Sequence, residues 1–580
     1  MALTKLNSNV TTFTQAGTDA TARSIDNKLE EIVHFKDFGA AGDGTTNDLT
    51  AVLAAFNAAD GKVLDGGGFT YKCNSNIAPT CQNITVQNAT FDFSGVTSIG
   101  ADGYIQFLGS SLDGTNIEAD VNVGDNTFTV ASTTGLTTKD SWHILEDSQI
   151  VYTSEGLTLG QYVFVKEVNE SSKLVTLHND VLYKFKTANT AQLVPVTMKK
   201  NITFRNVIIK GANPTGVTTD NNHCGIKFQK CENVTIYNCT FEDIHRIGVI
   251  FDACVNVKVS NSTCKHLTKT GTEYGFGIHN GCYGVNITNC YGQDLRHFVT
   301  IGDNEGINLF VNVTNCHITG CRDAGIDSHA AGDFVNFSGN TIEGSSFDSG
   351  QLDGIIFQGF NAIINDNIIV GMRRQAIFAQ QNNNLAAASG GTGSCVICGN
   401  QIINHGGDTS TSESGIYVLN DKNALGTIKG VTIANNIVEG EPDIGIYVFA
   451  SGGAISNVSI TGNSIGSHKV YGIMVRPGTD ANETVKMVTV TGNIVKAAAA
   501  SAAANAEGIF FYGNSTSGID TGTITGNVVD MSSNSGTDGI HLDYTDHVVV
   551  SNNVVANATA MLDPSGAAGD NVYANNINNS

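Results

Sequence analysis

The sequence predicts an all-β protein, a right-handed parallel β-helix (solenoid) with an N-terminal capping helix and a small inserted β domain. The first observation is a Cys or Asn that closes a short strand with alternating side chains, as in 458–463. This residue recurs every 23 to 36 positions, and such self-similarity indicates a stack of like rungs. Stacked amides can hydrogen-bond from rung to rung and satisfy buried turn backbone. The predicted ladder is Cys239, Cys264, Cys290, Cys316, Asn340, Asn367, Asn400, Asn436, Asn463, Asn493, Asn527, Asn553 and Asn576.

A second strand repeats within each rung and usually begins at a glycine. Examples are Gly225–Gln229, Gly248–Asp252, Gly277–His279 and Gly354–Gln358. Because strand side chains alternate, the apolar residue after the glycine is expected to point inward and the next residue outward. Several strands in one rung are typical of a parallel β-helix, whose long side wall suits an extended polymer better than a small molecule.

The first part of the chain is predicted to form an arm and a cap. Residues 1–34 carry no repeat and form a polar arm. Residues 35–115 hold the cap and the first rungs, and the segment 47–59 is predicted to be a helix over the first rung. A cap is needed because an open sheet end is an aggregation site.

Residues 116–198 interrupt the repeat and are predicted to form a small inserted β domain. Strands with a different rhythm are expected at 117–130, 161–168 and 173–177. The single Trp142 is interpreted as local core rather than as a platform for a sugar ring. The main β-helix then occupies residues 199–580.

Composition excludes several classes of partner. The net charge of −23 argues against nucleic acid and against anionic membranes, and no apolar run is long enough to span a bilayer. The 13 cysteines fall mostly at repeated positions and are expected to be reduced and buried. The pair Cys395 and Cys398 would face opposite sides of a strand, so no metal site is predicted there, and no cofactor is expected.

Two joined motifs near the start resemble a known family. The segment 13–30, followed by Lys36–Gly44, resembles the opening of bacteriophage tailspike proteins, which belong to the pectate-lyase-like superfamily of right-handed β-helices. The resemblance implies a component of the virion tail, attached to the tail or baseplate through residues 1–34. It also implies a homotrimer that binds or cleaves host surface polysaccharide, either capsule or O-antigen.

One wall of the predicted rod concentrates Arg, His and Asp. Five of the eight Arg lie between residues 246 and 374, and half of the 14 His lie between residues 223 and 329. The Arg side chains precede the second repeated strand, which predicts a basic strip along the rod. The predicted substrate-binding residues are Arg246, Asp252, Arg296, His297 and Arg322, and the predicted catalytic residues are Asp327, His329, Asp303 and His279.

These residue types fit two reactions. Glycoside hydrolysis needs two carboxyl groups, which Asp327 can form with Asp303 or with Asp252. β-Elimination on a uronic acid needs a cation for the sugar carboxylate, such as Arg296 or Arg322, and a base, such as His329 or His279. Asp327 and His329 lie two apart on one strand, so we expect them to face the same way and to bracket one glycosidic bond.

The segment Gly325–His329 also resembles the Asp-Pro-His segment of β-helical alginate epimerases and lyases. The match covers Asp327 and His329 only, because Ala324 stands where that family has its Tyr. Two alternatives stay open: a non-catalytic tail fibre or adhesin that only binds surface glycan, and a polysaccharide epimerase. The same His and Arg can also be solvated turn residues, and the site can lie between subunits.

Homotrimer formation is expected from an apolar stripe on the outer surface. One column of outward positions is predicted to carry apolar side chains, and such a stripe usually marks an interface. Its members are Ile250, Ile356, Phe378, Tyr417, Tyr447, Met474 and Phe510.

Overall fold

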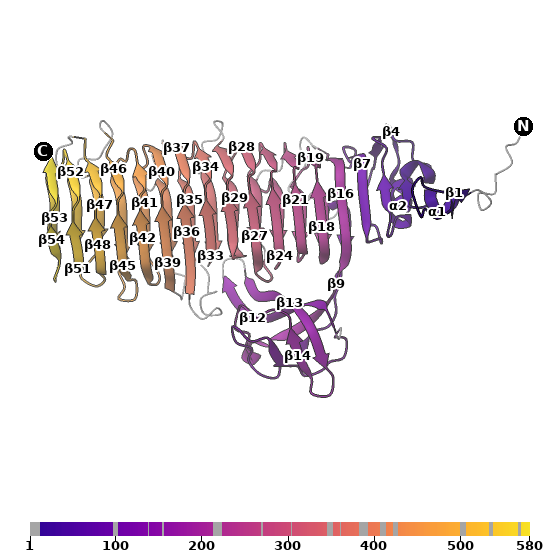
Figure 1. Ribbon diagram of the computed structural model, residues 1–580, viewed down its shortest axis with the longest axis horizontal. Coiled ribbons are helices and arrows are strands. Elements are labelled where there is room, and N and C mark those ends of the chain that lie inside the picture. Colours follow the sequence, from indigo (N-terminus) through magenta and orange to yellow (C-terminus); the bar gives the residue numbers. More distant parts are fainter. Residues whose placement is uncertain are drawn as a thin grey trace, which may run out of the picture.

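The protein is a long rod of stacked rungs with the arm and cap at one end and the C-terminus at the other (Figure 1). The computed structural model describes residues 12–96, 103–136, 139–152, 156–212, 223–267, 271–302, 304–344, 352–359, 361–381, 392–406, 413–421, 427–498, 506–532, 537–566 and 570–579.

Each rung of the rod contributes one strand to each of three parallel faces. Strand β17 (Cys224–Gln229) pairs with β20 (Ile247–Asp252), β18 (Cys231–Tyr237) with β21 (Val255–Ser260), and β19 (Thr240–Glu242) with β22 (Thr263–Lys265). The same step of three repeats along a continuous 46-stranded sheet. This architecture confirms the predicted parallel β-helix.

We call the face that carries the predicted site the wall sheet. After β17 and β20 it continues through β23 (Tyr274–His279), β26 (His297–Gly302), β29 (Ala324–Asp333), β32 (Asp353–Gly359), β35 (Gln375–Gln381), β38 (Ser414–Asn420), β41 (Ile444–Ala450), β44 (Tyr471–Pro477), β47 (Glu507–Tyr512), β50 (Asp538–Asp543) and β53 (Ala560–Gly566). Strand β8 (Gly103–Leu108) precedes β17.

The second sheet follows the wall sheet in each rung. It runs from β7 (Ile84–Asp92) through β16 (Lys199–Lys210), β18, β21, β24 (Tyr283–Thr288), β27 (Asn308–Thr314), β30 (Val335–Ser338), β33 (Asn361–Asn365), β36 (Thr392–Cys398), β39 (Thr427–Ala434), β42 (Ile455–Thr461), β45 (Val485–Thr491), β48 (Ile519–Thr525), β51 (Thr545–Ser551) and β54 (Val572–Ala574).

The third sheet is made of shorter strands. It runs through β19, β22, β25 (Tyr291–Gln293), β28 (His317–Cys321), β31 (Thr341–Gly344), β34 (Ile368–Val370), β37 (Gln401–His405), β40 (Ile437–Gly440), β43 (Ser464–Ile465), β46 (Ile494–Lys496), β49 (Val528–Asp530), β52 (Val554–Ala556) and β55 (Ile577–Asn579).

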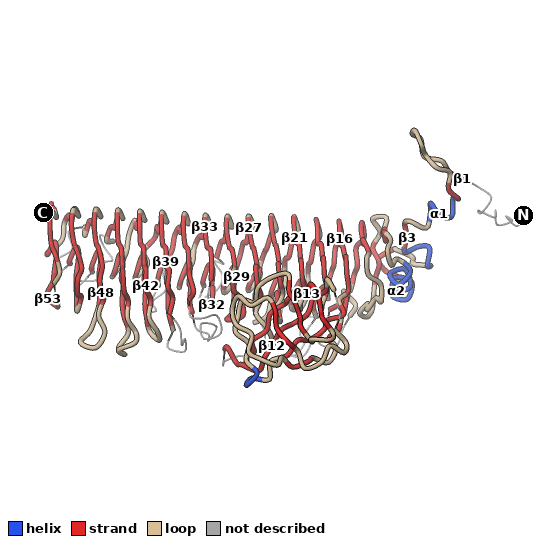
Figure 2. Tube along the Cα trace, turned by 60° about the horizontal axis from the view of Figure 1, so that its bottom comes forward, coloured by secondary structure: helices blue, strands red, loops and turns tan. Residues whose placement is uncertain are grey.

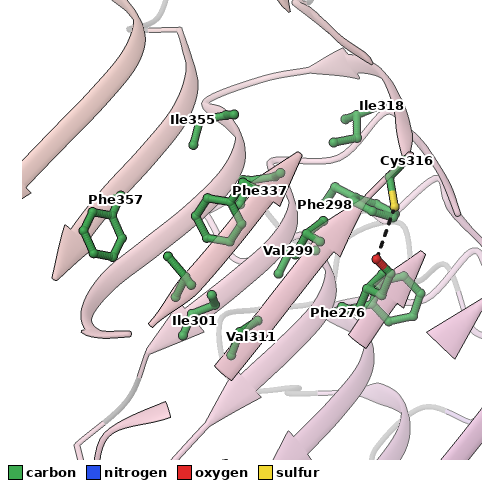
Figure 3. Close-up of a cluster of buried hydrophobic side chains, with 14 of the residues drawn as sticks. Phe276, Phe298, Val299, Ile301, Val311, Cys316, Ile318, Phe337, Ile355 and Phe357 are labelled. Atoms are coloured by element: carbon green, nitrogen blue, oxygen red, sulfur yellow. Dashed lines mark hydrogen bonds between the residues drawn. The ribbon is translucent and has the colours of Figure 1, made fainter. Parts of the chain in front are cut away.

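Stacked apolar side chains fill the interior of the rod. Phe276, Phe298, Phe337 and Phe357 come from neighbouring rungs and are at most 2% exposed (Figure 3). The apolar residue after each strand-opening glycine points inward as predicted; Ile226 and Val249 are fully buried. In the rung of β23, however, the register differs from the prediction by two residues. Phe276 takes the inward place and Gly277 lies opposite Ile250, which moves His279 to the outward place beside Asp252.

The amide ladder lies at the turn between the second and third sheets. The backbone N–H and the Nδ2 of Asn400 both donate to Oδ1 of Asn436, each at 2.9 Å, and Asn436 donates in the same way to Asn463. This pattern confirms the predicted hydrogen bonding from rung to rung. One member is corrected: Cys264 lies on β22, and Ser262 takes the ladder place between Cys239 and Cys290. All thirteen cysteines are free thiols, and Cys398 alone among them is only half-buried.

The arm and cap cover the first rungs. They contain strands β1 (Thr12–Phe13), β2 (Arg23–Ser24), β3 (Ile32–His34), β4 (Asp43–Asn47), β5 (Val63–Asp65) and β6 (Thr70–Lys72), helix α1 (Ile25–Leu29), the 3₁₀ turn η2 (Phe35–Phe38) and helix α2 (Leu49–Ala58). Helix α2 matches the predicted capping helix and buries Val52, Ala55 and Phe56 against the first rung. No helix in the described residues is long and apolar enough to cross a membrane.

An antiparallel sheet projects from the side of the rod (Figures 1 and 2). It consists of β9 (Ser110–Ser111), β10 (Thr115–Asn116), β11 (Thr127–Thr129), β12 (Ser141–Tyr152), β13 (Leu157–Asn169), β14 (Leu174–Leu177) and β15 (Gln192–Thr197), with the short 3₁₀ turn η3 (Thr187–Asn189). We call residues 110–197 the insert.

The insert differs from the prediction in one strand and agrees with it at its tryptophan. The segment 117–130 is not one strand, because Ile117 folds back to bridge Val130. Trp142 packs among Tyr162, Phe164 and Tyr283, and its indole N–H donates to Glu232 of the rod at 3.2 Å. It is therefore packing rather than an exposed platform.

Candidate functional site

Outward side chains of the wall sheet form columns along the rod. The central column is polar or small at Gly277, Thr300 and Asp327, apolar or aromatic from Ile356 to Phe510, and polar again at His541. Its register is Lys227, Ile250, Gly277, Thr300, Asp327, Ile356, Phe378, Tyr417, Tyr447, Met474, Phe510 and His541. Asp327 therefore lies where the wall changes from polar to apolar.

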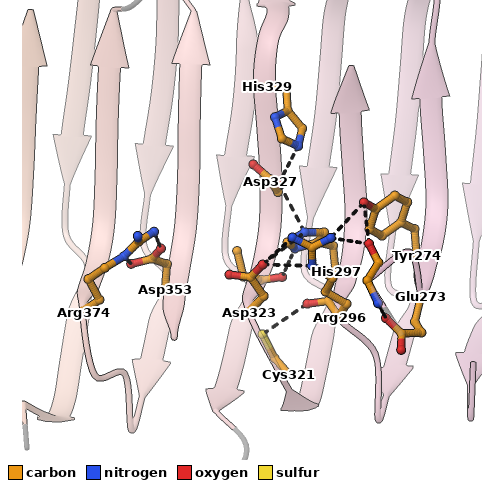
Figure 4. A network of polar contacts seen from close by, with 12 residues as sticks. Glu273, Tyr274, Arg296, His297, Cys321, Asp323, Asp327, His329, Asp353 and Arg374 are labelled. Carbon is orange, nitrogen blue, oxygen red and sulfur yellow. Dashed lines mark hydrogen bonds and ion pairs between the residues drawn. The ribbon is translucent and has the colours of Figure 1, made fainter. Parts of the chain in front are cut away.

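Asp327 joins two histidines at the centre of the predicted site (Figure 4). Its Oδ2 lies 2.9 Å from Nε2 of His329 and 3.3 Å from Nε2 of His297. Asp327 is 4% exposed and His297 is 1% exposed, whereas the His329 side chain is 36% exposed. A buried carboxylate thus holds a histidine whose ring reaches solvent.

The ionisation of this cluster follows from burial and charge. Burial raises the pKa of Asp327, but the nearby His297, His329 and Arg296 outweigh it and bring the pKa below its usual value. Burial lowers the pKa of His297, although Asp327 and Asp323 oppose that effect. Asp327 is therefore a carboxylate at neutral pH, which suits it to orient His329 rather than to donate a proton.

This geometry corrects the predicted roles of the pair. Asp327 and His329 touch each other, so they cannot bracket one glycosidic bond. Because a carboxylate only accepts, Nε2 of His329 carries the proton of this hydrogen bond. His297 lies beneath the surface and donates from Nδ1 to the carbonyl of Ala324 at 2.9 Å, so it supports the dyad rather than reaching a ligand.

The predicted basic strip is instead a row of ion pairs. Arg296 donates from Nε and Nη2 to Asp323 at 2.9 and 2.8 Å, and Arg322 lies 3.4 Å from Glu273. Arg374 pairs with the buried Asp353 (Figure 4). The sequence reasoning missed these three acids because each lies just before a strand or at its first residue, where only the stacking of rungs brings it to an arginine.

Other predicted residues lie around the dyad. Asp252 is 8% exposed; it accepts from Asn280 Nδ2 at 3.0 Å and from Gln229 Nε2 at 3.1 Å, so its oxygens are engaged inside the wall. His279 is half-buried and its ring lies over Gly277, which has no side chain to displace it. Arg246 is half-buried in the turn before β20. Asp303 lies outside the described residues.

The apolar half of the wall carries stacked rings that the prediction treated only as an apolar stripe. Tyr417 and Tyr447 stack at 4.7 Å between centroids, and the Arg476 guanidinium lies 4.9 Å from both the Phe449 and the Tyr512 rings. Tyr447, Met474 and Phe510 are at most 9% exposed. These side chains already cover one another within the chain.

Comparison with known proteins gives matches along most of the chain. The family model described as right-handed β-helix region matches residues 353–555. The tail spike protein of an Escherichia phage is 49% identical over 71 residues, which are 12% of this chain and 8% of that protein's length. The chain thus spans only a small part of this curated relative.

Two solved structures share the architecture at low identity. The tailspike protein gp49 of Pseudomonas phage LKA1 is 15% identical with a TM-score of 0.51, covering 92% of this chain and 81% of that one. The gp54 tailspike of Acinetobacter baumannii bacteriophage AP22 is 13% identical with a TM-score of 0.52, covering 86% and 78%. These likenesses show the fold: the chain is a right-handed parallel β-helix, the architecture that these two tailspikes also have.

Proposed function

We propose that the protein is a phage tailspike that binds and depolymerises a surface polysaccharide of the host bacterium. The observation that carries the proposal is the Asp327–His329 dyad, which lies on the long wall of a β-helix with a solvent-facing imidazole. The solved AP22 tailspike was captured with a capsular saccharide, which supports a polymeric glycan as the ligand class. In this proposal residues 1–34 attach the chain to the virion tail.

The dyad suits proton transfer at a sugar ring. Asp327 orients His329, and the imidazole takes the proton next to a uronate carboxylate. The electron pair of that C–H bond forms a C=C bond in the sugar ring, the neighbouring glycosidic C–O bond breaks, and the departing oxygen takes a proton from water. Arg296 lies one rung away with a third of its side chain exposed, where its charge can stabilise the developing anion. Among the described residues β-elimination fits this geometry better than hydrolysis, because Asp252, one of the two predicted partners of Asp327, has both oxygens engaged inside the wall.

The direct test is incubation of the full chain with purified capsule and O-chain of the host. New reducing ends together with ultraviolet absorbance of an unsaturated sugar show elimination, and reducing ends alone show hydrolysis. Binding without new ends favours the adhesin alternative. Altered sugar composition at unchanged chain length favours the epimerase.

The proposal also includes a homotrimer. We place the contact between its subunits on the third sheet and not on the apolar stripe that the sequence predicts. That stripe is largely buried within the chain, whereas one column of the third sheet carries exposed apolar side chains. Ile368, Ile437, Ile494, Val528 and Ile577 are 38–55% exposed, and their strands follow one another in register, with Gln401, Ser464 and Val554 between them. An exposed column of this kind supports packing against another copy.

A further inference from the structure

A cleft of about 520 Å³ lies between the insert and the rod, apart from the Asp327 dyad. Strands β12, β13 and β15 supply one side through Glu146, Tyr162 and Gln192. The turns that follow β17, β23 and β26 supply the other side through Lys230, Asn280 and Glu305. The volume is within the range of ligand sites.

The cleft is held open by backbone contacts rather than by mobile side chains. The N–H of Ile307 donates to the carbonyl of Gly160 at 2.8 Å, and the N–H of Gly306 donates to that of Thr158 at 3.1 Å. A Cβ on Gly160 would come within 3.2 Å of Gly306, so the absence of side chains lets the two backbones meet. The Tyr162 hydroxyl donates to the carbonyl of Ala253 at 2.7 Å and fixes β13 on the rod.

The side chain of Gln161 lies on the opposite face of the insert's sheet from Glu146 and Tyr162, so it does not open into the cleft. Gln161 is 1% exposed, and its Oε1 accepts from the N–H of Leu182 at 2.9 Å. Its Nε2 has no hydrogen-bond partner among the described residues. The polar side chains that line the cleft and can meet a ligand are those of Glu146, Gln192 and Lys230.

The charges around the cleft select the chemistry of that ligand. Glu146 accepts from Gln192 Nε2 at 2.8 Å; burial raises its pKa and the charge of Glu305 adds to that effect, while Gln192 and Lys230 oppose it. The charge of Lys230 on the lining disfavours a metal cation. Glu305 and Asp113 on the lining disfavour an anion.

We propose that this cleft is a second carbohydrate-binding site, which takes a neutral sugar unit through hydrogen bonds between its hydroxyl or acetamido groups and Glu146, Gln192 and Lys230. The inference rests on the proposed function, because it assumes that the ligand of the protein is a glycan. The cleft adjoins the wall through Asn280, which donates to Asp252. One polymer can therefore contact both the cleft and the wall.

The test uses the full chain and three single sugars: glucose, N-acetylglucosamine and glucuronate. Saturation-transfer NMR is expected to show binding of the neutral sugars and much weaker binding of glucuronate. Glu146→Gln and Lys230→Met are each expected to weaken binding by about tenfold, the effect of one good hydrogen bond. Glu167→Gln and Lys166→Met, on the exposed positions of β13, are matched controls and should bind as the parent does.

The outcomes separate this inference from the proposed function. His329→Ala should lose depolymerisation and keep sugar binding in the cleft. If the polymer is cleaved but the cleft variants bind sugars like the parent, or if glucuronate binds as well as glucose, the second site is refuted while the proposed function stands. If no polymer is cleaved but the cleft variants lose sugar binding, the second site is supported and the proposed depolymerase function is not.

Discussion

Single residues on the wall gain their properties from neighbours on adjacent rungs. Asp327 by itself is an ordinary carboxyl in a strand. Between His297 and His329 it becomes a buried anion, and it gives a solvent-facing imidazole a fixed orientation. The chemistry therefore belongs to the stack of rungs and not to any one segment.

Replacing Asp327 by Asn tests this role. The variant keeps the shape but loses the charge that orients His329, so we expect turnover of the matched polysaccharide to fall by about 10² or more. Binding of the polymer should be unchanged. Initial rates of product formation and binding isotherms measure the two effects. Asp294→Asn, at an exposed turn, is the control, and parental turnover in the Asp327 variant would mean that another part of the wall is the catalytic site.

Ladder residues are tested by a graded substitution at Asn436. Alanine removes the acceptor of two hydrogen bonds from Asn400 and leaves buried donors unpaired, which costs on the order of 3 kcal/mol. Serine restores one acceptor, as Ser262 does in its own rung. Urea unfolding should rank the parent above Ser and Ser above Ala. Equal stability of all three would show that the ladder amides contribute little.

The sequence predicts only part of the candidate site, because some of its residues are neighbours only through the stacking of rungs. The residues Asp327 and His329 are separated by two positions, so their common direction follows from strand periodicity alone. Their partners His297, Arg296 and Asp323 come from other turns, and only the register between rungs brings them together. The predicted register was wrong at Gly277 and at Cys264. At both places the error is two residues, and a shift of two leaves every inward side chain inward and every outward side chain outward. The alternation of apolar and polar residues therefore cannot reveal it.

At the scale of elements, one of the contacts that join the insert to the rod is a buried Tyr–Asp pair. The Tyr183 hydroxyl donates to Asp333 Oδ2 at 2.7 Å, and Oδ1 of Asp333 accepts from the backbone and side chain of Asn361. Both Tyr183 and Asp333 are at most 1% exposed. Burial raises the pKa of Asp333 to about 6, in spite of these hydrogen bonds.

This pair makes stability depend on pH in a defined direction. A carboxyl whose pKa is raised on folding binds its proton more tightly in the folded state. Its contribution is complete below the unfolded pKa, about 4, and is lost as the pH rises through about 6. Asp333→Asn should remove that dependence, and Tyr183→Phe should enlarge it, because the hydroxyl stabilises the ionised form. Unfolding by urea at pH 4, 5, 6 and 7 checks both, and an unchanged pH profile in Asp333→Asn would contradict the assignment.

Elements of the rod were predictable where the repeat is regular. Helix α2 and the parallel strands follow from apolar spacing that is visible in one segment at a time. The antiparallel insert was harder, because the segment 117–130 has alternating residues but turns back on itself, and its turn is specified by pairing with Val130 rather than by its own pattern.

At the scale of the whole molecule, assembly depends on which apolar column remains exposed. Ile494→Lys places a charge in the exposed column of the third sheet and should shift a trimer to monomers at micromolar concentration. Met487→Lys, on the second sheet at 52% exposure, is the matched control and should stay trimeric. Light scattering measures both masses. A monomer mass for the parent chain would refute the homotrimer, and a trimer in Ile494→Lys would place the contact elsewhere.

The step of three between paired strands also bears on how such a chain can change in evolution. Because each rung bonds only to the rungs directly above and below it, duplication or deletion of one whole rung keeps every other register intact. The rod can thus lengthen or shorten in increments of about 4.8 Å, the spacing of neighbouring strands. Descendants of one ancestor can hold the same wall at different distances from the N-terminal cap, with no change to the wall itself.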